Sequence, residues 1–524
     1  MEVKNIYNRA FALVAYGIVF FTNILYMFFN WENILNSDAS SELLLAEQLN
    51  HEGTFISKNW FYSTELRVLN TQFVHKLSLF FFHDNWKYAR CFSIAIFMLL
   101  ILCVTVYIGN QLSSIEFGLW ASVLMIAPVG KWYANNIIYF SYYVPHIVIT
   151  LVSIALVLHI SKSEANKKIA LSFILGIFAL VAGMGGIRQI MICYLPLIIA
   201  IIIDIIFKAI KNNTINKNQL FCQNGYIISG IIALLASGIG YIINHKLQYV
   251  YRFRSYEVMN WNRFDLSNMI KVFGDYLSLL GWNDETAVMG IGGLGNAAAL
   301  LLMSLLIISV IIYVRNYDKY QQHEKIFGLF FLSAFIVMLI CYSGISTYNE
   351  SYWVPLIPIT YLFVMLVIKK ALLESELIVE IKRCVIAVVS AATVMCSIST
   401  MYYPYVSSVV QYGKDRMAMM QWVIDNDYNQ VIAPFWDSNI LTELTNGKIE
   451  TWTVFKDLEI DRWLQVTAHD GTWPEGRVAV ILEKAELTDL YDEAEMANYL
   501  VYEDDDFLVY DFDDVSLYQK ILED

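Results

Sequence analysis

The residues Trp31-Glu-Asn-Ile-Leu-Asn-Ser-Asp38-Ala-Ser-Ser-Glu42 open a polar stretch that extends to residue 90 and stands between two strongly apolar runs. The stretch continues through Asn59-Trp-Phe-Tyr62-Ser-Thr-Glu65-Leu-Arg67-Val-Leu-Asn70. Long ordered loops are usually functional. Placing a carboxylate close to a bilayer costs free energy, so such residues usually have a functional role. We therefore interpret segment 31–90 as one wall of an outward-facing site, to which later loops on the same side contribute the other walls.

The composition indicates a polytopic membrane protein. The 524 residues are 57% hydrophobic and only 16% charged, with a mean hydropathy of +0.50, whereas soluble domains carry about 25% charged residues. Several apolar runs reach the roughly 18 residues that a membrane span requires. Because no small-residue cleavage site follows the first run, we expect it to be a retained span.

The charge is divided unevenly along the chain. Of the charged residues, 26 acidic and 8 basic ones fall in residues 402–524, although the net charge of the whole chain is only −13. We therefore expect a membrane domain over residues 1–401 and an acidic soluble domain over residues 402–524, for which nucleic-acid binding is not expected. The acidic part alternates helical and strand patterns, which predicts a small α/β domain. The expected fold class is thus mainly α.

Eleven membrane spans are predicted, near residues 10–30, 91–110, 115–130, 142–161, 169–184, 190–207, 224–244, 292–314, 326–343, 354–370 and 384–401. Lys and Arg gather in the short loops of one side, which predicts that this side and the N-terminus are cytoplasmic. The other side then receives 31–90, 131–141, 183–189, 245–291, 344–353 and the C-terminal domain. We therefore expect a multi-pass protein of the cell membrane whose C-terminal domain is extracytoplasmic.

Two helices are expected inside the first external loop. Residues Ala39–Asn50 and Glu65–Phe82 carry apolar side chains at helical spacing, which is typical of helices lying in the membrane interface. Asp38 directly precedes the first of them. Its simplest interpretation is an N-cap, and a catalytic role remains open beside it.

Two later external segments contain candidate anion ligands. His146 ends an aromatic stretch at the start of a predicted span, where it is either a satisfied histidine or a phosphate ligand. Gly183-Met-Gly-Gly-Ile-Arg188 combines accessible backbone N–H groups with an arginine, a combination that suits a phosphate. The alternative for Arg188 is an arginine reaching the membrane surface. Glu350, in the loop 344–353, is either a site residue or an ordinary solvated charge.

Chemistry at the outer face narrows the possible donors. No nucleotide-sugar pool exists there, so a transferase needs a donor that arrives through the membrane, such as a polyprenyl-phosphate sugar. Its leaving group is a phosphate, which needs cations or N–H donors, while one carboxylate must accept the proton of the acceptor hydroxyl. Asp38 is the candidate base. Candidate phosphate ligands are Arg188, His146 and Arg67, and candidate sugar or acceptor contacts are Trp60, Tyr62 and Glu65.

The layout resembles the GT-C superfamily of integral-membrane glycosyltransferases, whose first span is followed by a long external loop with two in-plane helices and an acid near its start. Ser37-Asp38-Ala-Ser-Ser-Glu42 stands where that acid is expected, and the resemblance implies that Asp38 is the catalytic base. Glu350-Ser351-Tyr352-x-x-Pro355 is similar to a late-loop pattern that often reads Glu-Arg-Tyr-x-x-Pro, which adds Glu350 and Tyr352 to the sugar or acceptor contacts. Serine replaces the arginine here.

Two further motifs, Ser63-Thr-Glu65-Leu-Arg67 and the stretch from Trp436 to Ile449, look like those of bacterial GT-C proteins that decorate cell-surface glycopolymers. The resemblance therefore implies monosaccharide transfer from a polyprenyl-phosphate donor to a cell-envelope glycopolymer, with the donor, the acceptor and membrane lipids as partners. No cofactor is expected. A divalent metal is not favoured either, because no Asp-x-Asp pair stands in the external loops before residue 400.

Two other function classes compete with this interpretation. A lipid or polysaccharide transporter or flippase would show internal repeats and matching broken helices, and the sequence shows no repeat. A membrane-anchored binding protein would place its function in the acidic domain, but eleven spans exceed what an anchor needs.

Overall fold

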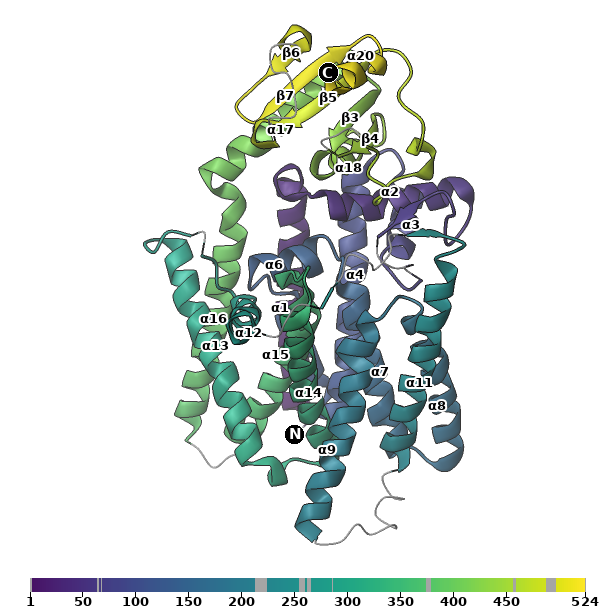
Figure 1. Cartoon of the computed structure of the whole chain (residues 1–524). Coiled ribbons are helices and arrows are strands. Elements are labelled where there is room, and N and C mark those ends of the chain that lie inside the picture. The colour runs from purple at the N-terminus through teal and green to yellow at the C-terminus, as the bar shows by residue number, and fades with distance from the viewer. Residues whose placement is uncertain are drawn as a thin grey trace.

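The computed structural model describes residues 2–63, 66, 68–212, 224–253, 260–261, 265–284, 286–373, 378–455, 459–486 and 496–523. The described chain forms a bundle of long helices with a small α/β domain at one end (Figure 1). The two termini lie toward opposite ends of the molecule (Figure 1). The prediction of a mainly helical membrane protein with a small C-terminal α/β domain is confirmed.

Within the described residues, ten helical segments are long and apolar enough to cross a membrane. Their helices are α1 (Glu2–Ile34), α4 (Trp86–Leu112), α7 (Val144–Lys162), α8 (Ala165–Gly183), α9 (Leu195–Asn212), α11 (Asn224–Leu247), α13 (Ile291–Arg315), α14 (Gln322–Gly344), α15 (Ile357–Ile368) and α16 (Val379–Tyr402). Short π or 3-10 segments extend α9 and α15, namely η2 (Ile190–Tyr194), η5 (Glu350–Leu356) and η6 (Lys369–Leu373). The protein is therefore a multi-pass membrane protein.

One of the eleven predicted spans, 115–130, is shorter than predicted. Helix α5 (Ile115–Ile126) has 12 residues, so its length of roughly 18 Å falls short of the roughly 30 Å hydrocarbon core. The chain then leaves the helical conformation and re-forms α6 (Lys131–Tyr133) and η1 (Ala134–Tyr139) before α7 begins. The apolar run is thus a short helix followed by an irregular segment, which is tolerated at membrane depth where protein covers it.

The first long loop contains the two expected helices, at partly different positions. Helix α2 (Ser37–Glu52) closely matches the predicted one and lies across the end of the bundle (Figure 1). Helix α3 (Gln72–Phe81) begins later than predicted, at residue 72. The side chain of Leu66 is fully buried in an apolar cluster with Leu464, and its carbonyl accepts a hydrogen bond from another helix. These tertiary contacts explain why the chain near Leu66 stays outside α3.

The loop predicted over 245–291 also contains a helix that the sequence analysis did not identify. Helix α12 (Leu266–Ser278) is capped by Asp265, whose side chain accepts from the Ser267 N–H. It lies across the direction of the long helices and is seen end-on in Figure 1. Val272 and Tyr276 are buried beneath it while Leu266 and Ile270 are exposed, as expected of a helix in the membrane interface.

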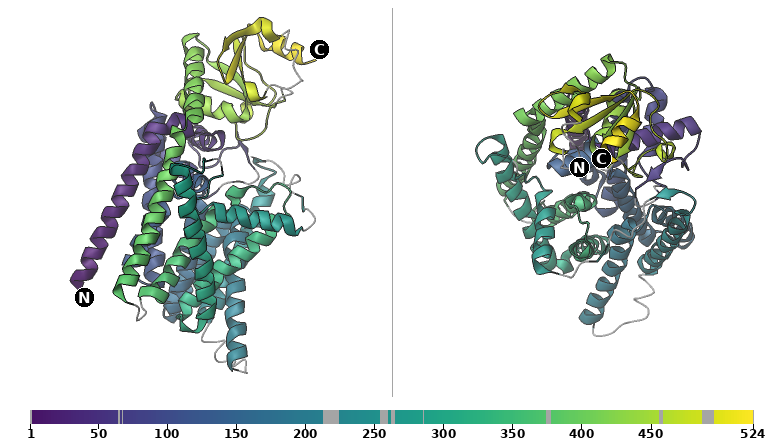
Figure 2. Two further views of the ribbon diagram at one scale, coloured as in Figure 1. Left: turned by 90° about the vertical axis from the view of Figure 1, so that its left-hand side faces the viewer. Right: turned by 45° about the horizontal axis from the view of Figure 1, so that its top comes forward.

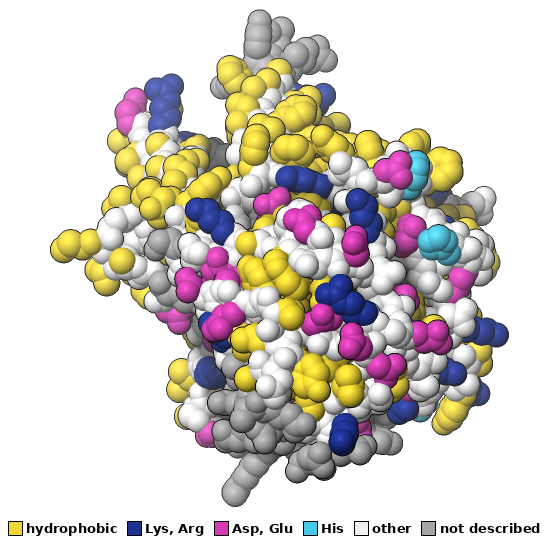
Figure 3. Space-filling view, turned by 90° about the horizontal axis from the view of Figure 1, so that it is seen from above, with side chains coloured by type: hydrophobic (Ala, Val, Ile, Leu, Met, Phe, Trp, Pro, Cys, Tyr) yellow, Lys and Arg dark blue, Asp and Glu magenta, His cyan; other side chains and the backbone are white. Residues whose placement is uncertain are grey.

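The C-terminal domain is a five-stranded mixed sheet with flanking helices. Its strands are β3 (Gln430–Pro434), β4 (Glu450–Val454), β5 (Val478–Glu483), β6 (Leu500–Glu503) and β7 (Phe507–Phe512), in the order β4-β3-β5-β7-β6. Strands β4, β3 and β5 are parallel, and β7 runs antiparallel to β5 and β6. Its main helices are α17 (Ser407–Asp425), α18 (Phe435–Leu444) and α20 (Val515–Glu523). Seen from this end, acidic side chains are interspersed with Lys and Arg (Figure 3).

The C-terminal domain packs directly on the first loop. Helix α18 contacts α2. A two-stranded parallel pair, β1 (Phe61–Tyr62) with β2 (Arg252–Phe253), adjoins the domain, because the Phe61 N–H donates to the Gln465 carbonyl at 2.8 Å. A bridge between Trp60 and Val466 joins the loop to the domain. One apolar cluster contains Trp31 and Leu35 of the membrane part together with residues of the sheet. Figure 2 shows that the domain covers part of this end of the bundle.

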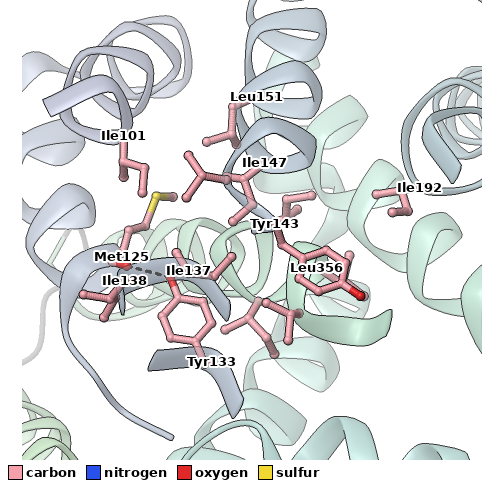
Figure 4. Close-up of a cluster of buried hydrophobic side chains, with 14 of the residues drawn as sticks. Ile101, Met125, Tyr133, Ile137, Ile138, Tyr143, Ile147, Leu151, Ile192 and Leu356 are labelled. Atoms are coloured by element: carbon pink, nitrogen blue, oxygen red, sulfur yellow. Dashed lines mark hydrogen bonds between the residues drawn. The ribbon is translucent and has the colours of Figure 1, made fainter. Parts of the chain in front are cut away.

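A second part of this core positions the start of α7. The side chains of Ile101, Met125, Tyr133, Ile137 and Ile147 are buried together (Figure 4). The Tyr133 hydroxyl donates to the Met125 carbonyl at 2.6 Å. This packing fixes the irregular segment between α5 and α7, and Tyr143 lies at the edge of the same group (Figure 4).

Candidate active site

Arg188 is the cation around which the candidate site is built. Its guanidinium carbon lies 5.2 Å from the ring centroid of Tyr143 and 5.2 Å from that of Tyr352. Each cation–π contact is worth roughly 0.5–1 kcal/mol at an exposed site and more when water is excluded. Arg188 follows α8, Tyr143 precedes α7 and Tyr352 is in η5, so three segments that are distant in sequence meet at one half-buried cation.

His146 contacts the same tyrosine as this cation. It is in the first turn of α7, with its ring centroid 5.8 Å from that of Tyr143. The amide nitrogen of Gln189 is 2.7 Å from His146 Nδ1. Because Gln189 follows Arg188 in the chain, this contact ties the two predicted phosphate ligands to one another. His146 is half-buried.

The segment with Glu350 and Tyr352 forms another side of the site. Asn349 caps η5 by accepting from the Ser351 N–H at 2.8 Å, and the Tyr352 carbonyl accepts from the Tyr342 hydroxyl at 3.1 Å. Ser351, which stands where the family pattern has arginine, has its hydroxyl 3.4 Å from that of Tyr143. The positive charge beside Tyr352 therefore comes from Arg188 of another segment. Glu350 is two residues from Tyr352 and half-buried.

The glycine-rich turn before Arg188 has a different role from the one predicted. The N–H groups of Met184, Gly185 and Gly186 donate within the turn, to Leu180, Ala182 and Gly183. The interpretation that these particular N–H groups are accessible to a phosphate is therefore wrong. Gly186 has φ of 103°, which favours glycine, and a Cβ on Gly183 would lie 2.1 Å from the Ser237 carbonyl of α11. The glycines thus turn the chain and bring two helices close together.

Asp38 is in the first turn of α2 and is not its cap. The cap is Asn36, whose Oδ1 accepts from the Ala39 N–H at 2.9 Å. The possibility that Asp38 serves only as the N-cap is therefore excluded. A helix N-terminus stabilises negative charge, so this position favours an ionised Asp38. One turn later, Glu42 is buried and accepts a hydrogen bond from the Thr71 hydroxyl.

Trp60 and Tyr62, predicted as sugar or acceptor contacts, are both buried. Trp60 is 1% exposed and Tyr62 is 2% exposed, and both pack in a cluster with Leu464 of the C-terminal domain. The Tyr62 hydroxyl accepts from the Ser57 N–H at 3.0 Å, and burial raises the pKa of this phenol. Their packing is structural in this conformation, so a direct sugar contact would require segment 463–466 to move.

Glu65 and Arg67 lie outside the described residues, but Leu66 between them is placed. The buried side-chain amide of Asn244 donates to the Leu66 carbonyl at 3.3 Å and to the Met184 carbonyl at 2.6 Å. One residue of α11 therefore connects the first loop to the turn that carries Arg188. Both segments lie at the same end of the bundle, as the single-site hypothesis requires.

The contacts thus join His146, Arg188 and Tyr352 into one group, while Asp38 lies on α2 at the start of the loop that Asn244 connects to it. Tyr143 and Gln189 were not among the site residues predicted from the sequence. Gln189 could have been suspected from the sequence. An uncharged polar side chain at the start of an apolar run costs free energy to bury unless it is hydrogen-bonded. Tyr143 could not be distinguished in the sequence from the neighbouring aromatic residues, which are typical of a membrane interface.

No protein-family model matches the sequence, and no curated protein matches it. The structure is similar to the crystal structure of ArnT from Cupriavidus metallidurans bound to undecaprenyl phosphate, with a TM-score of 0.52 and 11% identity, covering 97% of this chain and 98% of that chain. It is also similar to the Archaeoglobus fulgidus oligosaccharyltransferase in complex with Zn and sulfate, with a TM-score of 0.51 and 10% identity, covering 93% of this chain and 68% of that chain. At these identities the similarity is one of fold, and it extends over nearly the whole chain.

Proposed function

We propose that this chain, which has the fold of the GT-C integral-membrane glycosyltransferases, transfers a monosaccharide from a polyprenyl-phosphate donor to a cell-envelope glycopolymer at the outer face of the cell membrane. The observation that carries the proposal is the placement of Arg188 over Tyr143 and Tyr352 beside His146. A half-buried arginine beside a histidine, at the loop end of a membrane bundle, suits a lipid-linked phosphate.

The proposed reaction is a direct displacement. A hydroxyl oxygen of the acceptor attacks the anomeric carbon of the donor, and the bond from this carbon to the phosphate oxygen breaks. Asp38 accepts the proton of the attacking hydroxyl. Arg188 and His146 stabilise the charge that develops on the departing polyprenyl phosphate. Tyr352, beside Arg188, and Glu350, two residues before it, contact the sugar or the acceptor.

The choice of donor is supported by the fold comparison. The ArnT structure, which shares this fold over 98% of its own length, holds undecaprenyl phosphate. A transferase of the outer face also has no nucleotide sugar to use. The proposed sidedness is supported by the positive charges at the other end of the bundle, where Lys162 donates to the Gln111 carbonyl and Lys369 to the Ser113 hydroxyl. Basic residues in short loops are typical of the cytoplasmic side.

The proposal includes no required divalent metal, because Arg188 and His146 are assigned to the leaving phosphate and no Asp-x-Asp pair stands in the external loops before residue 400. Transfer should therefore persist when EDTA is added. Loss of transfer in EDTA, with recovery on adding Mg²⁺ or Mn²⁺, would show that this part of the proposal is wrong.

The test is a transfer assay on the purified protein in lipid nanodiscs. A panel of polyprenyl-phosphate monosaccharides is supplied with envelope polysaccharides, and the release of polyprenyl phosphate is measured beside the labelling of the polymer. We expect release with at least one donor, and none with Asp38→Asn. If no donor is consumed while proteoliposomes translocate a labelled polyprenyl lipid, the protein is a flippase and the transferase proposal fails.

A further inference from the structure

Gln189 makes contacts that restrict the chemistry of His146. Its amide nitrogen is 2.7 Å from His146 Nδ1 and 3.4 Å from the His146 carbonyl oxygen. Its amide oxygen is 3.4 Å from the hydroxyl of Thr150. Gln189 and Thr150 are both buried. The Gln189 amide therefore contacts the first two turns of α7 in the protein interior.

The orientation of the Gln189 amide follows from its neighbours. A backbone carbonyl oxygen only accepts hydrogen bonds, so the group facing the His146 carbonyl must be the NH₂. The Thr150 hydroxyl donates to the same carbonyl at 2.8 Å. Rotating the amide by 180° would place its oxygen against the His146 carbonyl oxygen, which is electrostatically unfavourable. The NH₂ group therefore also faces Nδ1.

An NH₂ group at 2.7 Å requires that His146 Nδ1 accepts, and a neutral imidazole then carries its proton on Nε2. We infer that Gln189 is a positioning residue that holds His146 in the neutral Nε2–H tautomer. This inference rests on the proposed function for its meaning. Within that function, His146 meets the donor phosphate as a neutral N–H donor, and Arg188 supplies the positive charge.

A site with one cation, Arg188, and one neutral donor, His146, has a physical advantage over a site with two cations. Arg188 and His146 share Tyr143 as a neighbour, so a protonated His146 would add a second positive charge to the same half-buried site. A neutral N–H donor avoids this repulsion and still gives the phosphate a directed hydrogen bond. Gln189 thus acts as the outer partners of ligating histidines do, by fixing the tautomer of the ring nitrogen that faces the ligand.

The test measures the tautomer directly. Protein labelled with ring-¹⁵N histidine is prepared in nanodiscs at pH 7.5, and the His146 signals are assigned from their loss in His146→Asn. We expect an unprotonated Nδ1 and a protonated Nε2 in the wild type. Gln189→Met, similar in size but unable to donate, should give a mixture of tautomers. Gln189→Glu, whose carboxylate accepts from Nδ1–H, should leave Nδ1 protonated.

A wild-type signal with a proton on Nδ1 would overturn the inference without any variant, and so would an unchanged tautomer in Gln189→Met or Gln189→Glu. The transfer assay gives a separate readout. Losing one hydrogen bond should lower kcat in Gln189→Met by about tenfold. If the tautomer is as inferred but His146→Asn transfers sugar normally, the role proposed for His146 fails while the positioning by Gln189 stands.

Discussion

The guanidinium group of Arg90 pairs with the carboxylate of Glu443 in the interior of the protein, with Nε–Oε1 and Nη2–Oε2 distances of 2.5 Å. Arg90 is on α4 and Glu443 is on α18, 353 residues later. Arg90 Nη2 also donates to the Ala39 carbonyl at 3.1 Å, and Trp31 donates to Glu443 at 3.3 Å. This pair therefore joins the first loop, with its candidate base, to the C-terminal domain.

Removing either partner should destabilise the protein strongly. Glu443→Gln leaves Arg90 buried without a counter-charge, and such losses cost about 3–5 kcal/mol. We expect a lower melting temperature in detergent, measured by intrinsic fluorescence. Arg90→Met combined with Glu443→Leu should recover most of the loss, because no charge is then buried.

The surface pair Arg477–Asp511 is the matched control, since it is also bidentate but its arginine side chain is 48% exposed. Asp511→Asn, which removes the carboxylate charge as Glu443→Gln does, should cost less than about 1 kcal/mol. Equal melting temperatures for the wild type and Glu443→Gln would contradict the importance of the buried pair.

Asp38→Asn should abolish sugar transfer while the protein remains folded. The α2 helix is capped by Asn36, so the substitution removes a proton acceptor and leaves the cap in place. Loss of a general base typically lowers the rate by about 10²–10⁴-fold. Transfer rate and melting temperature are measured on the same preparation.

Asn36→Ala is the reciprocal control. It should lower stability by about 1 kcal/mol through the lost cap and retain measurable transfer. Asp38→Asn with full activity would remove this residue from the mechanism.

Arg188→Ala should weaken use of the donor more than use of the acceptor. A hydrogen bond to a charged group is worth about 1.5–3 kcal/mol, so the Kd for polyprenyl phosphate should rise about 10- to 150-fold. Binding is measured by titrating the lipid into nanodiscs. Arg462→Ala, which removes an exposed arginine paired with Asp470 in the C-terminal domain, should leave the Kd unchanged. An unchanged Kd in Arg188→Ala would mean that another group holds the phosphate.

The local patterns of the sequence were sufficient for much of the fold. The acidic part alternates helix and strand as its patterns predict, because strands such as Gln430–Pro434 and Phe507–Phe512 are short apolar runs between turn residues. Helix α2 also lies close to its prediction, because its apolar positions repeat with helical spacing. The spans follow from the length of the apolar runs alone, and the one misjudged span, 115–130, contains the irregular segment 127–130 that composition does not reveal.

The candidate site depended on contacts that local patterns do not encode. Arg188 and His146 were identifiable as polar residues at the mouths of spans, and the structure brings them together. The pairing of Arg90 with Glu443 could not be predicted, because it joins residues far apart in sequence. Trp60 and Tyr62 were assigned to sugar binding from residue type alone. Residue type does not decide the role, because aromatic side chains serve binding and packing equally well. Only the docking of the C-terminal domain on the first loop shows that they are buried.

The buried histidine of α3 should make stability depend on pH. His75 Nδ1 is 2.8 Å from the Ser93 hydroxyl, which itself donates to the Ser78 hydroxyl at 2.7 Å. Ser93 therefore accepts from the Nδ1–H of His75. Burial, with a further contribution from Arg90, lowers the pKa of His75 well below its ordinary value of 6.5.

Because the folded state binds fewer protons than the unfolded state, the stability contributed by His75 is complete above pH 6.5 and is lost as the pH falls toward the lowered pKa. The loss should approach about 1.4 kcal/mol per pH unit below this range. His75→Asn, which can still donate to Ser93, should flatten the dependence of melting temperature on pH between 7.5 and 5.5. His83→Asn, at a histidine with an exposed side chain, should not. Parallel pH profiles for the wild type and His75→Asn would show that another group titrates.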